Sequence, residues 1–164
     1  KAGVEAGQTN LFKGKAWITT PEKETNSESI EIIRELALSL GSKWLTATAD
    51  SHDEVVALIS HLPVLVSAAL VQMITKEGNL SKLNLAKELA STGFSDTSRV
   101  GGGNPELGLS MMKNNTSKIL CLLNSYKQSI GTLEEALISE EWEKVNQILK
   151  TNQIVRRNFM QEVK

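Results

Sequence analysis

The chain has one cysteine, two histidines and almost no net charge, and each shortage excludes a class of protein. Because Cys121 has no second cysteine to pair with, the chain forms no internal disulfide, which is compatible with a reducing compartment. The net charge of -1, from 18 basic and 19 acidic residues, gives no reason to expect nucleic acid or a membrane surface as a partner. The longest apolar run, Val64 to Val71, is too short to span a bilayer.

Two further expectations concern the single thiol and the start of the chain. Cys121 lies in the apolar run ILCLL at 119–123, so we expect a buried, inert thiol. The chain begins at Lys1, without a start methionine and without a signal peptide. We therefore expect a segment of a longer, cytoplasmic polypeptide, and the 40% of hydrophobic residues predicts a globular protein with its own core.

The first 50 residues have the pattern of a strand, a helix and a second strand. β-prone runs at 16–20 and 43–47 flank an amphipathic stretch at 28–40. Asn26 or Ser27 is the expected N-cap of this helix, and Gly41 its expected C-cap. Because two short strands do not form a stable sheet alone, further strands must come from upstream sequence, another chain or a rearrangement.

From residue 51 onward the periodicity is helical. Ser51 and Glu54 form a candidate capping box for a helix that runs to about Lys76, with Pro63 predicting a kink or break near Ser60. Further helices are predicted at 80–90, 105–113, 115–137 and 140–163. The last two predicted helices carry apolar residues that we expect to be buried, namely Ile119, Leu122, Leu123, Tyr126, Ile130, Leu133 and Leu137, then Trp142, Val145, Ile148, Leu149, Ile154 and Phe159.

A run at 97–108, TSRVGGGNPELG, places one arginine beside three glycines and the start of a helix. Arg99 is permanently charged, and its planar fork matches a carboxylate or a phosphate. The glycines would let the backbone approach a bound group and adopt positive φ, while Asn104 and Pro105 would begin a helix whose free amides point to the same place. The competing interpretation is a plain linker beside a solvated arginine. Neither a dinucleotide fingerprint nor a P-loop fits, because the residues at 94–97 are turn-like and no Gly-Lys-Ser/Thr follows.

Other candidate chemistry is sparse. His52 and His61 cannot share one helical face and have no third ligand, so we expect no metal site. His52 is either a helix cap or a ligand contact, and His61 is either a buried imidazole bonded to the carbonyl that Pro63 frees or a ligand contact. We interpret the acidic pairs at 134–135 and 140–141 as solvated helix faces. The residues alone indicate an α-helical module with one candidate anion site.

Several segments together resemble the prephenate/arogenate dehydrogenase family, most closely its cyanobacterial and plant-type arogenate dehydrogenases. The segments are HD at 52–53, ISHLP at 59–63, GFSDTSRVGGGNP at 93–105 and the opening AGVEAG at 2–7. The resemblance covers essentially the whole chain. It implies an oxidative decarboxylation in tyrosine biosynthesis, in which a ring hydride passes to NAD(P)+ and the ring carboxylate leaves as CO2.

The resemblance also implies roles for particular residues. Arg99 occupies the position of the family's carboxylate-binding arginine, and the substrate-binding residues implied with it are His61, Thr97, Ser98 and Gly102. The family's catalytic histidine and glycine-rich nucleotide loop would lie upstream of Lys1, so we expect no catalytic residue in this chain. NADP, or NAD, would be bound mainly by that upstream domain. The substrate would be arogenate or prephenate, and Val64, where many prephenate-using relatives have histidine, favours arogenate.

With the resemblance, the predicted fold is mainly α. A βαβ remnant of a Rossmann-type dinucleotide-binding sheet is expected at 1–50, and an all-helical substrate-binding and dimerisation domain at 51–164. The resemblance implies a homodimer formed through the long helices, for which the stripe at 119–137 is the candidate contact. Two other hypotheses stay open. The chain is alternatively a non-catalytic helical module for oligomerisation or regulation, or the helical domain of a related β-hydroxyacid-type dehydrogenase.

Overall fold

The computed structural model describes residue 4 and residues 7–161. The chain forms two compact units, Lys1–Asn115 and Thr116–Lys164. Most of the opening motif at 2–7 and the expected end of the last helix lie outside the described residues. The boundary after residue 50, which concerns the domains of the family, stays a prediction.

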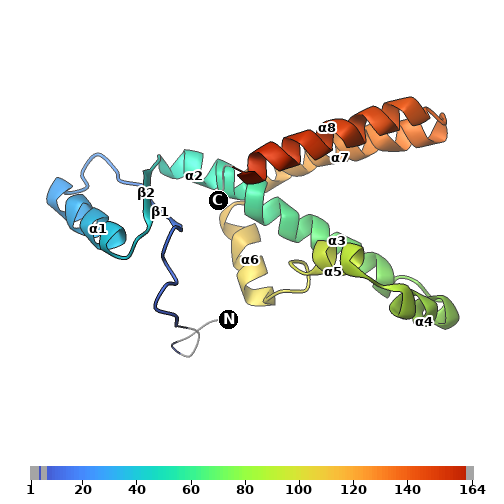
Figure 1. Cartoon of the computed structure of the whole chain (residues 1–164), viewed down its shortest axis with the longest axis horizontal. Coiled ribbons are helices and arrows are strands. Elements are labelled where there is room, and N and C mark those ends of the chain that lie inside the picture. The colour runs from blue at the N-terminus through green and yellow to red at the C-terminus, as the bar shows by residue number, and fades with distance from the viewer. Residues whose placement is uncertain (1–3, 5–6, 162–164) are drawn as a thin grey trace. The chain divides into compact units, whose positions relative to one another are not determined.

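The first unit begins with the expected strand–helix–strand (Figure 1). Strand β1 (Ala16–Thr19) pairs in parallel with β2 (Lys43–Thr46), in a register that sets Ala16 opposite Lys43. Helix α1 (Ser27–Ser39) connects the two strands. The predicted βαβ order is therefore confirmed, with a sheet of only two strands among the described residues.

Both ends of α1 are closed by the residues expected to close them. The Asn26 side chain accepts the backbone N–H of Glu28 at 2.7 Å and that of Ser29 at 3.1 Å. At the other end Gly41 has φ 76°, the left-handed conformation that glycine adopts without strain. Its N–H and that of Ser42 then bond back to carbonyls in the last turn of the helix, as in a Schellman motif.

One helix continues without a break from Ala49 to Thr75. It consists of α2 (Ala49–Val56), a π-helical turn η2 (Ala57–His61) and α3 (Leu62–Thr75). Because Pro63 has no N–H and its ring crowds the preceding turn, the backbone widens there. The kink or break expected near Ser60 is thus a π turn inside a continuous helix. The expected capping box is wrong, since the cap is Thr48, whose Oγ1 accepts the Ser51 N–H at 3.1 Å.

The length of this helix corrects an expectation about membranes. The apolar run at 64–71 is short, but the helix Ala49–Thr75 has 27 residues and is apolar enough, by length and composition, to cross a bilayer. The core helix of a soluble protein passes the same test. Only a small part of this helix is buried within the chain, so most of its apolar surface has no cover from the chain itself.

Three shorter helices complete the first unit. They are α4 (Leu80–Leu89), α5 (Thr92–Ser98) and α6 (Pro105–Asn114). The interpretation of 94–97 as a turn is wrong, because these residues belong to α5. The α5 sequence, TGFSDTS, contains weak helix formers, so the stability of this helix depends on its contact with α3.

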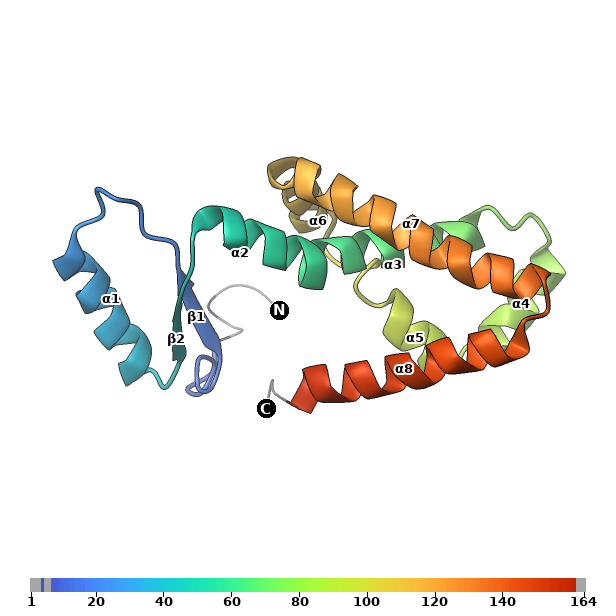
Figure 2. The ribbon, with the colours of Figure 1, turned by 90° about the horizontal axis from the view of Figure 1, so that it is seen from above.

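The second unit is a helical hairpin of α7 (Thr116–Ile138) and α8 (Trp142–Gln161) (Figures 1 and 2). Glu140 forms the turn with φ 53°, a left-handed conformation that costs energy for any residue with a Cβ. The N–H of Glu140 bonds to the Leu137 carbonyl and that of Glu141 to the Ala136 carbonyl, which is a second Schellman motif. Glu140 is therefore a turn residue and not part of a solvated helix face.

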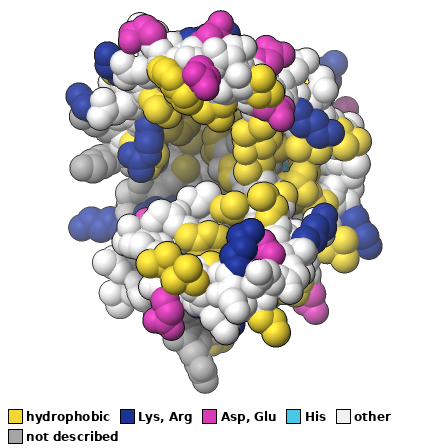
Figure 3. Space-filling model, turned by 90° about the vertical axis from the view of Figure 1, so that its right-hand side faces the viewer, with side chains coloured by type: hydrophobic (Ala, Val, Ile, Leu, Met, Phe, Trp, Pro, Cys, Tyr) yellow, Lys and Arg dark blue, Asp and Glu magenta, His cyan; other side chains and the backbone are white. Residues whose placement is uncertain are grey.

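The chain buries few large apolar side chains. The buried apolar residues among those described are Ala37, Ala57, Leu62, Ile119 and Ala136. Hydrophobic side chains are instead visible at the surface among charged ones (Figure 3). The expectation of a substantial core within this chain is therefore not met.

The α7–α8 hairpin also buries few of its large apolar side chains. Ile119 is buried and other members of the α7 stripe are half-buried, but Ile130 and Leu137 are exposed. Of the six α8 residues expected to be buried, Val145 and Ile148 are half-buried, whereas Trp142, Leu149, Ile154 and Phe159 are exposed by 56–59%. Cys121 is exposed as well, so the prediction of a buried thiol is wrong. The physical reason is that a hairpin covers one seam of each helix and leaves the other apolar positions without a partner.

Candidate functional site

The segment that carries Arg99 is held against α3 by one buried hydroxyl group. Ser67, only 2% exposed, donates its Oγ–H to the Thr97 carbonyl at 2.7 Å. The same oxygen accepts the N–H of Gly101 at 2.8 Å. These two bonds lie on either side of Arg99 in the sequence, so the backbone at Arg99 is fixed relative to α3.

Gly101 makes a close backbone approach to α3. A Cβ at this position would lie 2.3 Å from the Ala68 nitrogen and 2.4 Å from the Ser67 carbonyl carbon, far inside van der Waals contact. Positive φ among the described glycines occurs at Gly14 and Gly41, so the expectation of positive φ in the run 101–103 is wrong. The first glycine of the run is needed for packing and not for a left-handed turn.

The Arg99 side chain extends from this fixed backbone into solvent. Arg99 directly follows α5 in helical conformation, with φ -56° and ψ -46°. It is exposed and makes no hydrogen bond or ion pair with another residue in the described part of the chain. All five guanidinium N–H donors are thus available to a ligand such as a carboxylate.

The three neighbours expected to help Arg99 have their hydrogens engaged elsewhere. Thr97 donates its hydroxyl hydrogen to the Gly93 carbonyl at 2.7 Å, and Ser98 donates its own to the Phe94 carbonyl at 2.6 Å. The Gly102 N–H donates to the Ser98 carbonyl at 3.2 Å. In this arrangement Thr97 and Ser98 offer a ligand only acceptor oxygens. Their substrate contacts stay predictions.

The start of α6 attracts an anion less than its sequence suggests. The Asn104 side chain accepts the Leu107 N–H at 3.0 Å, and Pro105 has no N–H at all. Glu106 adds a negative charge to the first turn. The expected convergence of free amides on an anion is therefore reduced, and Arg99 is left as the one cationic side chain of the segment 97–108.

His61 ends the π turn and faces a buried amide. Its Nδ1 lies 3.4 Å from Nδ2 of Asn115, which is 6% exposed and also donates to the Asp53 carbonyl at 2.7 Å. Because Asn115 Nδ2 is a donor, Nδ1 is the acceptor and the imidazole proton belongs on Nε2. The expected partner of His61, a carbonyl freed by Pro63, is replaced by this side chain. His52 pairs with the Asp53 carboxylate at 3.0 Å and does not cap the helix.

The contacts of His61 and of the Arg99 segment lie along one stretch of helix. Ser67 follows His61 by six residues, a rise of about 9 Å along a helix axis. A cavity of about 230 Å³ lies against α3, the glycine segment and α6. The residues that line it are Val64, Leu65, Ala68, Val100, Gly101, Gly103, Asn104, Pro105, Gly108, Leu109 and Met112. Its lining is mainly apolar, so it suits a hydrophobic part of a ligand.

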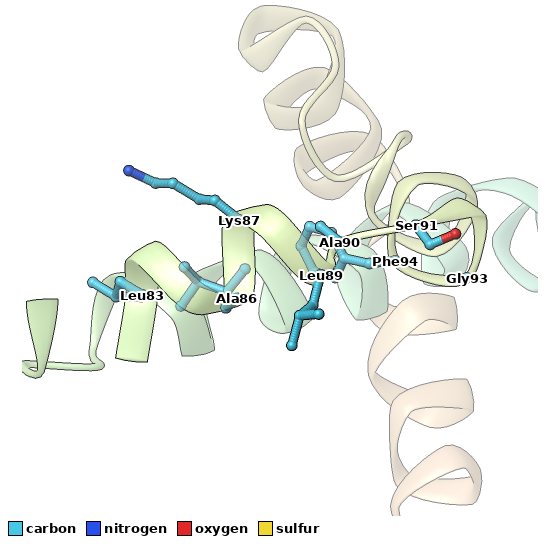
Figure 4. Close-up of a pocket in the computed structure, with 9 residues that line it drawn as sticks. Leu83, Ala86, Lys87, Leu89, Ala90, Ser91, Gly93 and Phe94 are labelled. Carbon is cyan, nitrogen blue, oxygen red and sulfur yellow. The ribbon is translucent and has the colours of Figure 1, made fainter. Parts of the chain in front are cut away.

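A second, larger cavity has different chemistry. It measures about 530 Å³ and is formed by α4, α5 and the end of α3 (Figure 4). Its lining is apolar apart from Ser91 and Lys87, and the Lys87 ammonium extends away from the apolar side chains (Figure 4). A cavity without a converging charged group suits apolar contact and not the binding of an anionic substrate.

Comparison with known proteins decides the family. Residues 48–151 match the domain family described as "Prephenate dehydrogenase, dimerization domain". The chain belongs to the prephenate/arogenate dehydrogenase family. The resemblance drawn from the motifs is thereby confirmed, as is the mainly helical fold with a parallel strand pair before the dimerisation domain.

Relatives of known activity agree with this assignment. The chain is 28% identical over 151 residues to a prephenate dehydrogenase of Bacillus subtilis, covering 92% of this chain and 40% of that protein. It is 27% identical to a cyclohexadienyl dehydrogenase of Zymomonas mobilis, covering 94% of this chain and 52% of that protein. The chain thus spans about half the length of these relatives, which are oxidoreductases.

Solved structures show the same fold. Synechocystis arogenate dehydrogenase superposes with a TM-score of 0.83 at 40% identity, covering 92% of this chain and 54% of that one. A prephenate dehydrogenase from A. aeolicus, in complex with hydroxyphenyl propionate and NAD+, superposes with a TM-score of 0.88 at 26% identity. The match covers 97% of this chain and 55% of that structure.

The turn that follows β1 is not of the kind that holds a dinucleotide. Strand β1 is followed by Thr20 and Pro21 and not by a glycine-rich turn, so no cradle for a pyrophosphate is present there. No cluster of three or more His, Cys, Asp or Glu side chains suited to a metal ion occurs in the described ranges.

Two residues that support the site were missed in the sequence. Ser67 is the one polar residue in the apolar run 64–71, and a lone hydroxyl in such a run is a signal for a specific buried partner. Asn115 stands between α6 and α7, where an asparagine is easily taken for an ordinary helix cap. Both are buried polar residues that contact a segment far away in the sequence, which local patterns do not reveal.

Proposed function

We propose that this chain supplies the substrate-carboxylate site and the dimer contact of an NADP-dependent arogenate/prephenate dehydrogenase. The observation that carries the proposal is the unpaired Arg99 guanidinium on a backbone fixed to α3. In the proposed reaction Arg99 holds the side-chain carboxylate of a cyclohexadienyl substrate while the ring carboxylate leaves as CO2. A bound nicotinamide supplies the hydride acceptor, and its binding groups lie outside the residues described. His61, with its proton on Nε2, is a donor of the same site.

Two observations favour arogenate as the substrate. The chain is 40% identical to Synechocystis arogenate dehydrogenase, a higher identity than to the prephenate dehydrogenases compared above. Val64 lines the 230 Å³ cavity, where a side chain of this type offers no hydrogen bond to a keto or carboxylate group. We therefore propose arogenate as the preferred substrate and prephenate as the poorer one.

The exposed apolar residues support a homodimer. A chain with this little internal core presents large hydrophobic surface on the helix Ala49–Thr75 and on α8, and such patches mark assembly surfaces. We propose that a second copy covers these surfaces, in keeping with the dimerisation-domain family that the chain matches. A cytoplasmic location is part of the same proposal.

The test of the proposed site is Arg99→Ala in the complete protein, assayed with arogenate and NADP. Loss of a charged, bidentate contact of about 2–4 kcal/mol predicts a rise in KM of about 30- to 1000-fold. Arg34→Ala is the matched control, because Arg34 is also exposed and forms an ion pair with Glu31 on its own helix. The control is expected to leave KM unchanged, and an Arg99→Ala enzyme with the same KM as the control would contradict the proposal.

A second candidate function is a non-catalytic helical module for oligomerisation or regulation. The exposure of Arg99 favours it, because an arginine without a task in binding is also expected in solvent. The same experiment separates the two. The module predicts a dimer that neither turns over arogenate nor changes its association when arogenate is added.

A further inference from the structure

We infer that Ser67 is a positioning residue that sets where the Arg99 guanidinium meets the substrate carboxylate. The inference rests on the proposed function of Arg99. Its starting point is that one buried oxygen both donates to the Thr97 carbonyl and accepts from the Gly101 N–H, at 2.7 and 2.8 Å. Arg99 lies midway between these two residues in the sequence.

The hydrogen bonds of Ser67 differ from those usual for serine in a helix. Such a hydroxyl commonly bonds back to a carbonyl one turn earlier in its own helix. Ser125, Ser129 and Thr132 of α7 follow this rule. Ser67 instead reaches segments that are 30 and 34 residues away. Its hydroxyl therefore links α3 to the segment that carries Arg99, instead of forming a hydrogen bond within its own helix.

No other hydrogen bond joins α3 to the segment 97–103 in the part of the chain that the structure describes. The rest of the contact is van der Waals packing, tightest at Gly101, where the two backbones touch. Packing of this kind resists compression but does not prevent sliding along the helix. The Ser67 hydroxyl supplies the directional restraint.

Removing this hydroxyl frees the backbone that carries Arg99. Ser67→Ala leaves the Thr97 carbonyl and the Gly101 N–H without their partner, and both regain hydrogen bonds only if the segment moves toward water. Because a displacement of about 1 Å at a binding group can cost up to about 100-fold in rate, a modest shift is enough to weaken the carboxylate contact. The side chains that touch the substrate stay chemically unchanged.

The experiment is a double-mutant cycle on the complete protein, with initial rates measured over a range of arogenate concentrations at saturating NADP. Ser67→Ala is expected to raise KM about tenfold, equivalent to about 1.4 kcal/mol, and to change kcat by less than about threefold. In an Arg99→Ala background the same substitution is expected to have no further effect on KM, because the group that it positions is gone. Ser67→Thr, which keeps the hydroxyl, is expected to restore most of the affinity.

Two controls keep the test decisive. Ser129→Ala removes a hydroxyl that bonds to the Ser125 carbonyl of its own helix, and it is expected to leave both constants unchanged. Ser67→Cys keeps nearly the same volume with a much weaker hydrogen-bonding group, and it replaces Ser67→Ala if that variant does not fold. Its KM is expected to lie between those of the serine and alanine enzymes.

The outcomes separate this inference from the proposed function. If Arg99→Ala leaves KM unchanged, the proposed role of Arg99 fails and the inference fails with it. If Arg99→Ala raises KM but Ser67→Ala and Ser67→Cys do not, only the positioning role of Ser67 is overturned. An equal rise on Ser67→Ala in both backgrounds would also overturn it, since Ser67 would then act independently of Arg99.

Discussion

Gly101→Ala tests the contact between the arginine segment and α3 at its tightest point. The added Cβ would stand 2.3 Å from the Ala68 nitrogen and 2.7 Å from the Ser67 carbonyl oxygen. Both neighbours are backbone atoms of a helix and cannot rotate away as a side chain would. The segment itself must therefore retreat from α3 by about 1 Å to restore ordinary contact.

The loss of stability in Gly101→Ala comes from the hydrogen bond and the packing that this retreat disrupts. The Gly101 N–H is 2.8 Å from the Ser67 oxygen, so a retreat of about 1 Å takes it beyond hydrogen-bonding distance. Each buried hydrogen bond lost costs about 0.5–1.5 kcal/mol, and forcing a methyl group into packed backbone costs about 1–3 kcal/mol. We expect Gly101→Ala to lower the free energy of unfolding by about 2–5 kcal/mol.

The assay is chemical denaturation of the complete protein, followed by circular dichroism. Gly102→Ala is the matched control, because the closest atoms to its added Cβ are 3.9 and 4.0 Å away and its φ is not positive. The control is expected to stay within about 0.5 kcal/mol of the parent protein. Equal stabilities of the two variants would refute the close approach of Gly101 to α3.

Three further predictions follow from the turn, the cavity and the exposed helix. Glu140→Gly relieves the strain of a left-handed backbone and is expected to raise the free energy of unfolding by about 0.5–1 kcal/mol, whereas Gly41→Ala introduces such strain and is expected to lower it. If chemical denaturation shows Glu140→Gly to be no more stable than Gly41→Ala, the turn geometry is contradicted. Val64→His is expected to raise kcat/KM for prephenate relative to arogenate, and an unchanged ratio would remove Val64 from the basis of substrate preference. Ile154→Asp, at an exposed position of α8, is expected to weaken the dimer in sedimentation velocity, and a dimer of unchanged stability would place the contact elsewhere.

The helix predicted most closely is the one whose N-cap and C-cap are formed by residues next to its ends. Asn26 and Gly41 close α1 through bonds to atoms within four residues, so the sequence itself contains the relevant partners. Helix α5 was missed because its weak helix formers depend on contact with α3, which no local pattern reports. Pro63 was expected to kink the helix, and the π turn that absorbs it depends on how the surrounding turns pack.

Burial and the site were less accessible to sequence reasoning. Apolar periodicity identified which face of α8 is hydrophobic, but it did not show whether this chain itself or a second copy covers that face. Trp142 on α8 and Cys121 on α7 are both exposed. Arg99 was identified by its permanent charge and its neighbours. Ser67 and Gly101 were assigned no such role, because their importance arises from a contact between positions more than 30 residues apart.

The most direct test of the account is a crystal structure of the complete protein with hydroxyphenyl propionate, the ligand present in the A. aeolicus prephenate dehydrogenase structure. We expect the ligand carboxylate to accept hydrogen bonds of about 2.7–2.9 Å from the Arg99 guanidinium. We also expect Ser67 to remain bonded to both Thr97 and Gly101 in that complex. A carboxylate bound elsewhere, with Arg99 left in solvent, would contradict the central claim.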